Sequence, residues 1–115
     1  MGKTIFSKII SKEIPADILY ESETVMAFRD IKPQAPVHVL IIPKEEISAV
    51  SELKRFEHAG LLGEMFDAAN IIAKKMALDK EGFRLVFNNG RNGGQEVNHL
   101  HMHLLGGRQM KWPPG

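Results

Sequence analysis

The sequence predicts a single domain of mixed helices and β-strands, in which one long helix packs on a sheet. Two patterns lead to this prediction. Apolar residues recur at helical spacing over residues 53–78, and several short β-branched or aromatic runs are bounded by Pro, Gly and polar turns. The chain has 115 residues, 43% of them hydrophobic, which suits one hydrophobic core rather than two.

The N-terminal third predicts a short helix followed by strands. Thr4 is a candidate cap for a helix that ends by Pro15. Residues 17–30 contain two strand-like runs around a polar turn, which predict an antiparallel hairpin. The apolar run 37–42 lies between prolines and is typical of a central strand covered on both faces, with His38 at its entrance.

The long helix predicted over residues 53–78 is apolar over much of its circumference. One stripe is widened by a second set: Phe56, Leu62, Phe66, Ala69, Ala73 and Met76, then Leu61, Met65, Ala68 and Ile72. We therefore expect two partners for this helix, the domain's own sheet and a second subunit. Strands predicted at 82–89 and 95–107, joined by the Gly-rich turn 90–94, complete the sheet.

Composition excludes several classes of function. Lys and Arg number 15 against 14 Asp and Glu, and no basic run offers a footprint for a nucleic-acid polymer. No apolar run is long enough for a membrane span, and the charged N-terminal stretch lacks a signal core, so we expect a cytoplasmic protein. Without cysteine, disulfides, thiolate nucleophiles and Cys-ligated zinc are excluded.

The stretch "HLHMH" places histidines at positions 99, 101 and 103. On a strand these three imidazoles share one face, with neighbouring Cα atoms about 6.6 Å apart and the outer pair about 13 Å apart. We expect them to line an open surface groove. The opposite, core-facing side is expected to take the alternate residues: Asn98, Leu100, Met102 and Leu104.

Three interpretations of this histidine cluster can be compared. It could be a solvated face that is merely rich in histidine. It could be a metal site, but the outer rings lie far apart, and the other candidate ligands, Glu96, Asp30 and His38, are not at a recognisable ligand spacing. The third interpretation, nucleophilic attack at phosphorus by one imidazole with its neighbours managing charge, fits best, and it needs no metal or cofactor.

The residues also resemble a known family. "QEVNHLHMHLLGG" resembles the motif of the histidine triad (HIT) superfamily, and "DIKPQAPVHVLIIPK" and "GGRQMKWPPG" resemble its histidine triad nucleotide-binding branch. The likeness runs from Thr4 to Gly115, so residues 1–115 are expected to form one such domain. The third histidine differs from the Gln of the nucleotidyl-transferase branch, which favours hydrolysis.

The resemblance implies an α+β fold: a five-stranded antiparallel sheet with one long helix and a short N-terminal helix. It also implies a homodimer whose sheets are continuous. The implied activity is hydrolysis of purine nucleoside 5′-phosphoramidates, and of aminoacyl-adenylates, through a nucleotidyl-histidine intermediate that releases AMP or GMP. Purine nucleoside monophosphates and phosphoramidates are therefore the expected ligands.

The resemblance also assigns roles to residues. It makes His101 the nucleophile, supported by His99 and His38, while His103 contacts the α-phosphate. Two further groups complete the nucleotide site. The resemblance assigns the phosphate to Asn88, Gln95, Glu96 and Val97. It assigns the ribose to Asp30. It assigns the purine base to six apolar residues: Ile5, Phe6, Ile9, Phe28, Ile31 and Leu40. It assigns the leaving group to Trp112 in the C-terminal tail, and this tail is expected to approach the partner subunit's site.

Alternatives remain open at this stage. From the residues alone Asp30 could equally start a turn, most of the apolar base-site residues could be core, and His38 could be structural. Glu96 stands where animal members have Ser, and Asn98 replaces a usual aromatic residue. The rival functions are a non-catalytic nucleotide-binding adaptor and a dinucleoside polyphosphate hydrolase, the second disfavoured by the "WPPG" ending.

Overall fold

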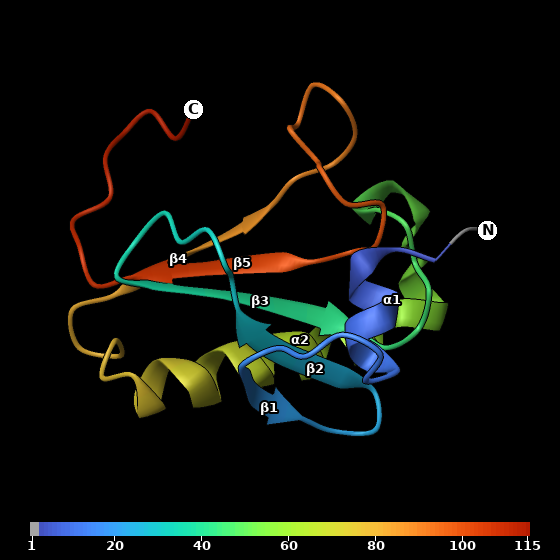
Figure 1. Ribbon diagram of the computed structural model, residues 1–115. Coiled ribbons are helices and arrows are strands. Elements are labelled where there is room, and N and C mark those ends of the chain that lie inside the picture. The colour runs from blue at the N-terminus through green and yellow to red at the C-terminus, as the bar shows by residue number, and fades with distance from the viewer. Residues whose placement is uncertain (1–2) are drawn as a thin grey trace.

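A computed structural model describes residues 3–115, and within them five strands form one antiparallel sheet (Figure 1). The strands are β1 (Ile18–Glu21), β2 (Val25–Arg29), β3 (Val37–Pro43), β4 (Phe83–Phe87) and β5 (Met102–Gly106). Their order is β1-β2-β3-β5-β4, with β3 in the centre. The helices are α1 (Ile5–Ile10), the 3-10 turn η1 (Val50–Glu52) and α2 (Arg55–Lys75). The α+β class, the hairpin and the central strand are confirmed.

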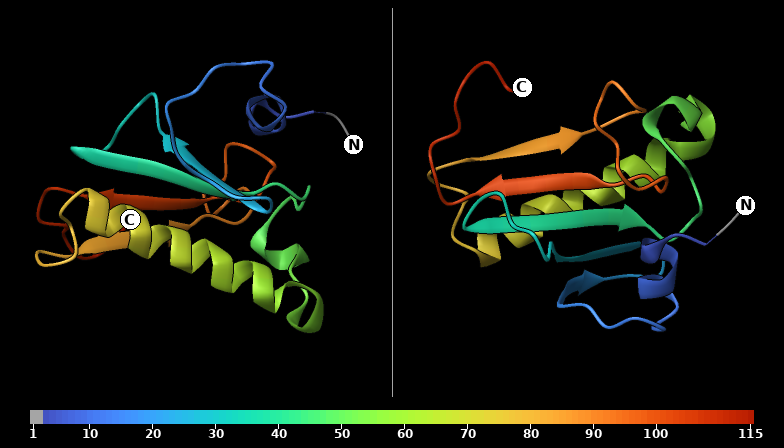
Figure 2. Two further views of the ribbon diagram at one scale, coloured as in Figure 1. Left: turned by 90° about the horizontal axis from the view of Figure 1, so that it is seen from below. Right: turned by 45° about the horizontal axis from the view of Figure 1, so that its top comes forward.

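The two faces of the sheet are covered by different helices, as Figure 2 shows. Alternate residues of each strand point to opposite faces. The face under α2 buries Val25, Ala27, Val39, Ile41, Met102 and Leu104. The face under α1 buries Met26, Phe28, Leu40 and Ile42 together with Phe6 and Ile9 of the helix. The six-residue α1 covers little of its face, so that face has room for a site.

Helix α1 begins as predicted but ends earlier. The Thr4 hydroxyl accepts the backbone N–H of Ser7 at 3.2 Å, which satisfies one of the free donors of the first turn. The helix stops at Ile10, because Lys12 has a positive φ of 68° and turns the chain away.

Helix α2 packs on its own sheet with one side and leaves several apolar side chains exposed on the rest of its surface. Met65 and Ile72 are fully buried against the sheet, as are three alanines that allow close packing. The large apolar side chains that remain exposed are Phe56 (92% exposed), Phe66 (44%) and Ile71 (44%). No helix within residues 3–115 combines the length and hydropathy needed to cross a bilayer.

The predicted last strand is too long at its beginning. Strand β5 starts at Met102, so His99 and His101 precede it. Its partner β3 ends at Pro43, which has no N–H to continue the ladder. The Leu100 N–H instead donates to the Ile47 carbonyl at 2.7 Å. Asn98, whose side chain was expected to point toward the core with a hydrogen-bond partner or to lie at its rim, is exposed in this irregular segment.

Candidate active site

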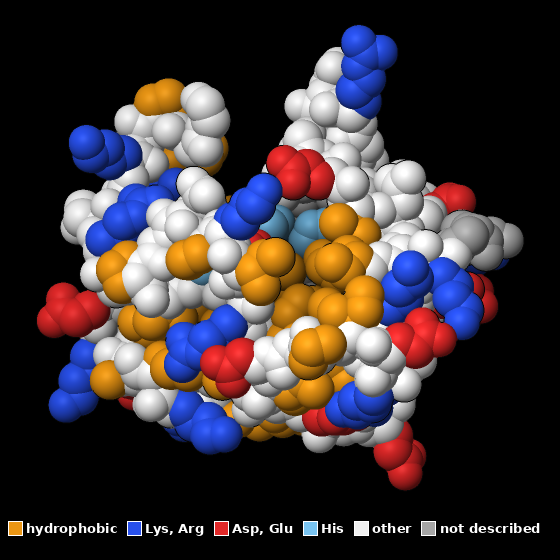
Figure 3. All heavy atoms as spheres, viewed as in Figure 1, with side chains coloured by type: hydrophobic (Ala, Val, Ile, Leu, Met, Phe, Trp, Pro, Cys, Tyr) orange, Lys and Arg blue, Asp and Glu red, His pale blue; other side chains and the backbone are white. Residues whose placement is uncertain are grey.

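The histidines gather on the face that α1 only partly covers. His38 comes from β3 and His103 from β5, while His99 and His101 lie in the segment that enters β5. Leu100, Met102 and Leu104 point to the opposite core, as the alternation predicted. Figure 3 shows pale-blue histidine atoms within a hollow bordered by hydrophobic side chains.

His101 has one ring nitrogen fixed as a donor. Its Nδ1 lies 2.8 Å from the carbonyl oxygen of His99, and since a carbonyl can only accept, Nδ1 carries the proton. In the neutral ring Nε2 therefore holds the free lone pair. The edge of the Phe6 ring packs against the imidazole at 5.0 Å between centroids. His101 is only 6% exposed, so the expected open groove is wrong, and the nucleophile candidate is nearly enclosed.

His99 connects the triad segment to the end of β3. Its Nε2–H donates to the Pro43 carbonyl at 2.8 Å, and the ring is 2% exposed. Burial lowers the pKa of His99, and the hydrogen bond to the carbonyl opposes part of that shift. The His99 ring is therefore closed to a ligand, and the hydrogen bond between His99 and His101 comes from the His99 backbone carbonyl.

A chain of hydrogen bonds sets the protonation of His38 and His103. The backbone N–H of Gln34 donates to His38 Nδ1 at 3.0 Å, so this nitrogen is unprotonated and Nε2 carries the hydrogen. His38 Nε2 lies 2.9 Å from His103 Nδ1, which must then accept. His103 is left with its proton on Nε2, as a donor for a ligand.

The pKa values agree with neutral rings in this chain. Burial, together with the neighbouring His101 and His38, lowers the pKa of His103 to about 4, and the Asp30 carboxylate opposes part of that shift. Burial also lowers the pKa of His38, although the Asp30 carboxylate opposes the shift. At neutral pH His103 is thus a neutral N–H donor rather than a cation.

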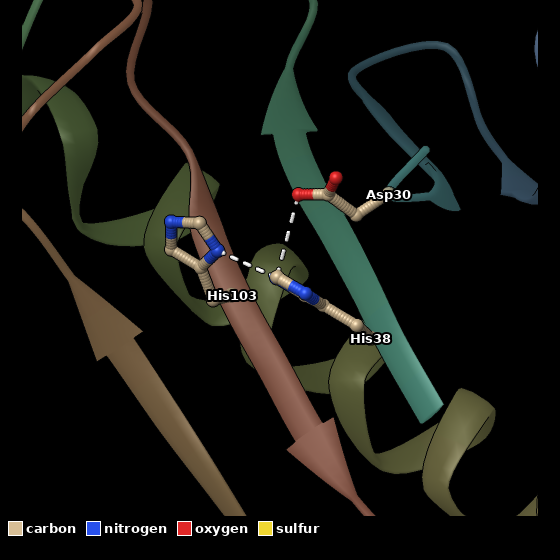
Figure 4. A group of neighbouring side chains, drawn as sticks. All are labelled: Asp30, His38 and His103. Carbon is tan, nitrogen blue, oxygen red and sulfur yellow. Dashed lines mark hydrogen bonds and ion pairs between the residues drawn. The ribbon is translucent and has the colours of Figure 1, made fainter. Parts of the chain in front are cut away.

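The Asp30 carboxylate accepts a hydrogen bond within a turn and also lies near His38 and His103. Its Oδ1 accepts the Lys32 N–H at 2.8 Å, the turn role that the sequence allowed. Its Oδ2 lies 3.5 Å from His38 Nε2, and Figure 4 shows Asp30, His38 and His103 directed toward one another. The ligand atoms of these three side chains lie within 4.8 Å of one another and could hold a metal ion. The sequence, which showed no ligand spacing here, did not reveal this cluster.

The residues assigned to phosphate lie in the loop between β4 and the triad. Asn88 uses one amide N–H to hold the Gly93 carbonyl at 2.8 Å. Glu96 is exposed and Val97 is half-buried. Gln95, expected among the nucleotide-binding residues, directs its side-chain amide at the Gly90 N–H and at the Ser48 and Val97 carbonyls.

The six residues assigned to the base divide into two groups. Ile5 (46% exposed) and Ile31 (87%) can contact a ligand. The others are buried beneath them and pack on one another: Phe6, Ile9, Phe28 and Leu40. In the tail, Trp112 is 82% exposed within the single chain.

Main-chain groups are the part of the site that sequence reasoning missed. The Gln34 N–H and the carbonyls of Pro43 and His99 set the state of every histidine in the cluster. A peptide group has no signature in a sequence, so no residue type could have identified them. The packing of Phe6 against His101 was also missed, because "IF" at the start of a helix is ordinary core patterning.

Comparisons with known proteins identify the family of this chain. The HIT domain matches residues 11–110. A "14 kDa zinc-binding protein" of Brassica juncea is 54% identical over 113 residues, which cover 97% of this chain and 99% of the relative. "Adenylylsulfatase HINT1" of Arabidopsis thaliana is 51% identical over 97% of this chain and 76% of its own length.

Solved structures give the same result. A HIT family hydrolase from Legionella pneumophila superposes with a TM-score of 0.95 at 48% identity, covering 98% of this chain and all of the other. The histidine triad nucleotide-binding protein from Candida albicans superposes with a TM-score of 0.82 at 32% identity, covering 96% and 83%. The chain therefore belongs to the HIT domain family.

Proposed function

We propose that this protein hydrolyses purine nucleoside 5′-phosphoramidates and releases the nucleoside monophosphate. The observation that carries the proposal is the state of His101. Its Nδ1–H is held by a main-chain carbonyl, which leaves the Nε2 lone pair available for attack. A non-catalytic adaptor would need the pocket but would not need a nucleophile prepared in this way.

The reaction takes two displacements at phosphorus. His101 Nε2 attacks, a P–N bond to the imidazole forms, and the P–N bond to the amine breaks as the amine takes up a proton from solvent. Water then attacks the same phosphorus and gives a proton to solvent, and the bond to Nε2 breaks. His103 Nε2–H donates to a phosphoryl oxygen, and because its ring is neutral it does so as a hydrogen-bond donor. His99 holds the His101 ring in place, and His38 holds the His103 ring in place.

The nucleoside part is bound at the mouth of the hollow. Ile5 and Ile31 offer exposed apolar surface for a purine, and Asp30 offers its carboxylate to the ribose hydroxyls. Asn88 and the peptide groups of Glu96 and Val97 hold phosphate oxygens. These assignments follow the family resemblance together with the positions of the side chains.

Turnover of adenosine 5′-phosphoramidate, followed by chromatographic detection of AMP, tests the proposal. Adenylylsulfate and a dinucleoside polyphosphate should be assayed beside it, because the leaving sulfate needs no proton whereas the leaving amine does. Preferred release of AMP from the phosphoramidate supports the proposed substrate class. Preference for adenylylsulfate would leave His101 as the proposed nucleophile but would change the proposed substrate class. AMP binding without any turnover would favour the non-catalytic adaptor.

We also propose a homodimer. The exposed Phe56, Phe66 and Ile71 give α2 an apolar surface that its own sheet does not cover, and β4 is an unpaired edge strand. Light scattering should give about twice the chain mass of 12.9 kDa. A monomeric mass would leave these side chains without the proposed partner.

Zinc binding is a second candidate function, which the cluster Asp30, His38 and His103 favours. Two imidazole nitrogens and a carboxylate oxygen are ligands that zinc takes. A metal would have to displace the proton shared by His38 and His103. Exhaustive EDTA treatment should leave phosphoramidate turnover unchanged under the first proposal, whereas a loss that zinc restores would favour the second.

A further inference from the structure

The loop over residues 88–98 precedes the candidate nucleophile and has no regular secondary structure. Such a segment can hold a phosphoryl group in place only if its peptide groups are themselves fixed. Two of its glycines, Gly90 and Gly94, have positive φ values of 70° and 76°, so the backbone conformation is specific.

The Gln95 side chain joins three parts of the site. Its Oε1 accepts the Gly90 N–H at 2.9 Å, and the Gln95 N–H returns a bond to the Gly90 carbonyl at 3.0 Å. Its Nε2 donates to the Ser48 carbonyl at 2.7 Å and to the Val97 carbonyl at 3.0 Å. One half-buried amide thus connects the glycine turn, the loop after β3 and the approach to the triad.

Two peptide N–H groups beside this amide are left free. Within residues 3–115, the backbone N–H groups of Glu96 and Val97 donate to no protein acceptor. They lie between Gln95 and His99, and the Gln95 amide fixes the Val97 carbonyl that follows them. The direction of both N–H groups therefore depends on the Gln95 side chain.

We propose that Gln95 is a positioning residue, whose side chain aims the free N–H groups of Glu96 and Val97 at the phosphoryl group under attack by His101. This inference rests on the proposed function. Fixed donors of this kind stabilise charge that develops in the transition state more than they stabilise the bound ground state. Loss of the Gln95 amide should therefore lower kcat more than it raises KM.

Gln95→Met tests this with a side chain of similar length that forms none of the three bonds. Because the donors are misdirected rather than removed, kcat should fall by about 10- to 30-fold while KM stays within about threefold. Gln109→Met is the matched control, since the exposed Gln109 amide donates only to the Met110 carbonyl. The control should keep both constants. An unchanged kcat in Gln95→Met would overturn the inference. Equal losses of kcat and AMP affinity together with a lowered Tm would also overturn it, because they would indicate a purely structural role for Gln95.

A second measurement does not depend on turnover. Addition of AMP to the wild-type protein should shift the amide NMR signals of Glu96 and Val97, and the shift should shrink in a folded Gln95→Met protein. Wild-type signals that do not move would overturn the inference. A wild-type protein without turnover, in which these signals still respond to AMP through Gln95, would refute the proposed function and leave only the orientation of the two N–H groups toward a bound phosphate.

Discussion

His101 and Met102 are neighbours in the chain but belong to opposite sides of the sheet. Met102 is fully buried in an apolar core beneath α2, among hydrophobic side chains. His101 is almost as buried, at 6% exposure, yet its ring meets a main-chain carbonyl, a Phe6 ring edge and the His103 ring. One peptide bond therefore separates a residue of the apolar core from the residue that we propose as the nucleophile.

The difference shows how a small protein can bury several titratable rings. A buried polar group is costly unless it is hydrogen-bonded. Each of the four clustered histidines has a hydrogen-bond partner, and no buried side-chain nitrogen or oxygen in residues 3–115 lacks one. The rings are oriented mainly by peptide groups, which come with the fold, while burial lowers the pKa values of His38, His99 and His103.

The largest effect should come from His101→Ala. Phosphoramidate turnover should fall by at least about 1,000-fold, because no covalent intermediate can form, while AMP affinity stays within about tenfold. Steady-state kinetics and calorimetric titration with AMP measure the two quantities. The Tm should change little. Substantial turnover in this variant would contradict the proposed nucleophile.

Met102→Ala should give the opposite result. Removal of a fully buried side chain on the α2 face should cost about 2–5 kcal/mol of unfolding free energy. At a temperature where the variant is folded, kcat and AMP affinity should remain within about threefold of the wild type. Urea unfolding and the same kinetic assay give the comparison. A selective loss of activity would show that the two faces are not energetically separate.

The histidine side should also make stability depend on pH. The folded-state pKa of His103 is about 4, below its ordinary value of 6.5, and burial lowers those of His38 and His99 as well. The unfolded chain therefore takes up protons first, so stability present above about pH 6.5 is lost as the pH falls toward about 4. His103 should account for roughly 2 kcal/mol of that loss, after allowance for its partial exposure.

Urea unfolding of the wild type and His103→Gln at about pH 7 and about pH 4.5 measures this contribution. Between these two pH values the His103→Gln variant should lose less unfolding free energy than the wild type loses. Equal losses would mean that other groups, such as the ion-paired Glu21, whose pKa Lys12 and Lys44 lower, dominate the acid response.

The smallest effect concerns the tail, which belongs to neither face. Deletion of residues 112–115 removes the exposed Trp112 and should shift selectivity among amine leaving groups by about 5- to 30-fold, while AMP affinity is spared. Lys111 should disfavour cationic amines, an effect that salt weakens. Competition assays with lysine-like and aromatic amine phosphoramidates measure the shift. Equal losses for every substrate would assign the tail to the fold instead.

Alternation along strands was the most predictable part of the structure. The pattern of β3, of the β1 and β2 hairpin and of Leu100, Met102 and Leu104 followed from apolar spacing and proline positions, and it placed the histidines opposite the α2 core. The family resemblance supplied the α+β class. The start of β5 could not be predicted, because it depends on Pro43, which is distant in the chain and ends the partner strand.

Burial and connectivity within the site were less predictable. Histidine spacing suggested an open face, but Phe6 of α1 covers His101, and this contact depends on how the N-terminal helix folds over the sheet. The side of α2 that faces the sheet was also uncertain, because its apolar residues surround much of the helix and only packing selects Met65 and Ile72 over Phe56. The roles of Gln34 and Gln95 depend on hydrogen bonds between distant segments.

The central claim is that His101 forms a covalent bond to phosphorus, and mass spectrometry of the quenched reaction tests it most directly. The protein is mixed with adenosine 5′-phosphoramidate, stopped rapidly without acid, digested and sequenced by fragmentation. We predict an adenylyl group on His101 that appears before free AMP and is absent from His101→Ala. An adduct on His99 or His103, or AMP release with no adduct at any time, would contradict the claim.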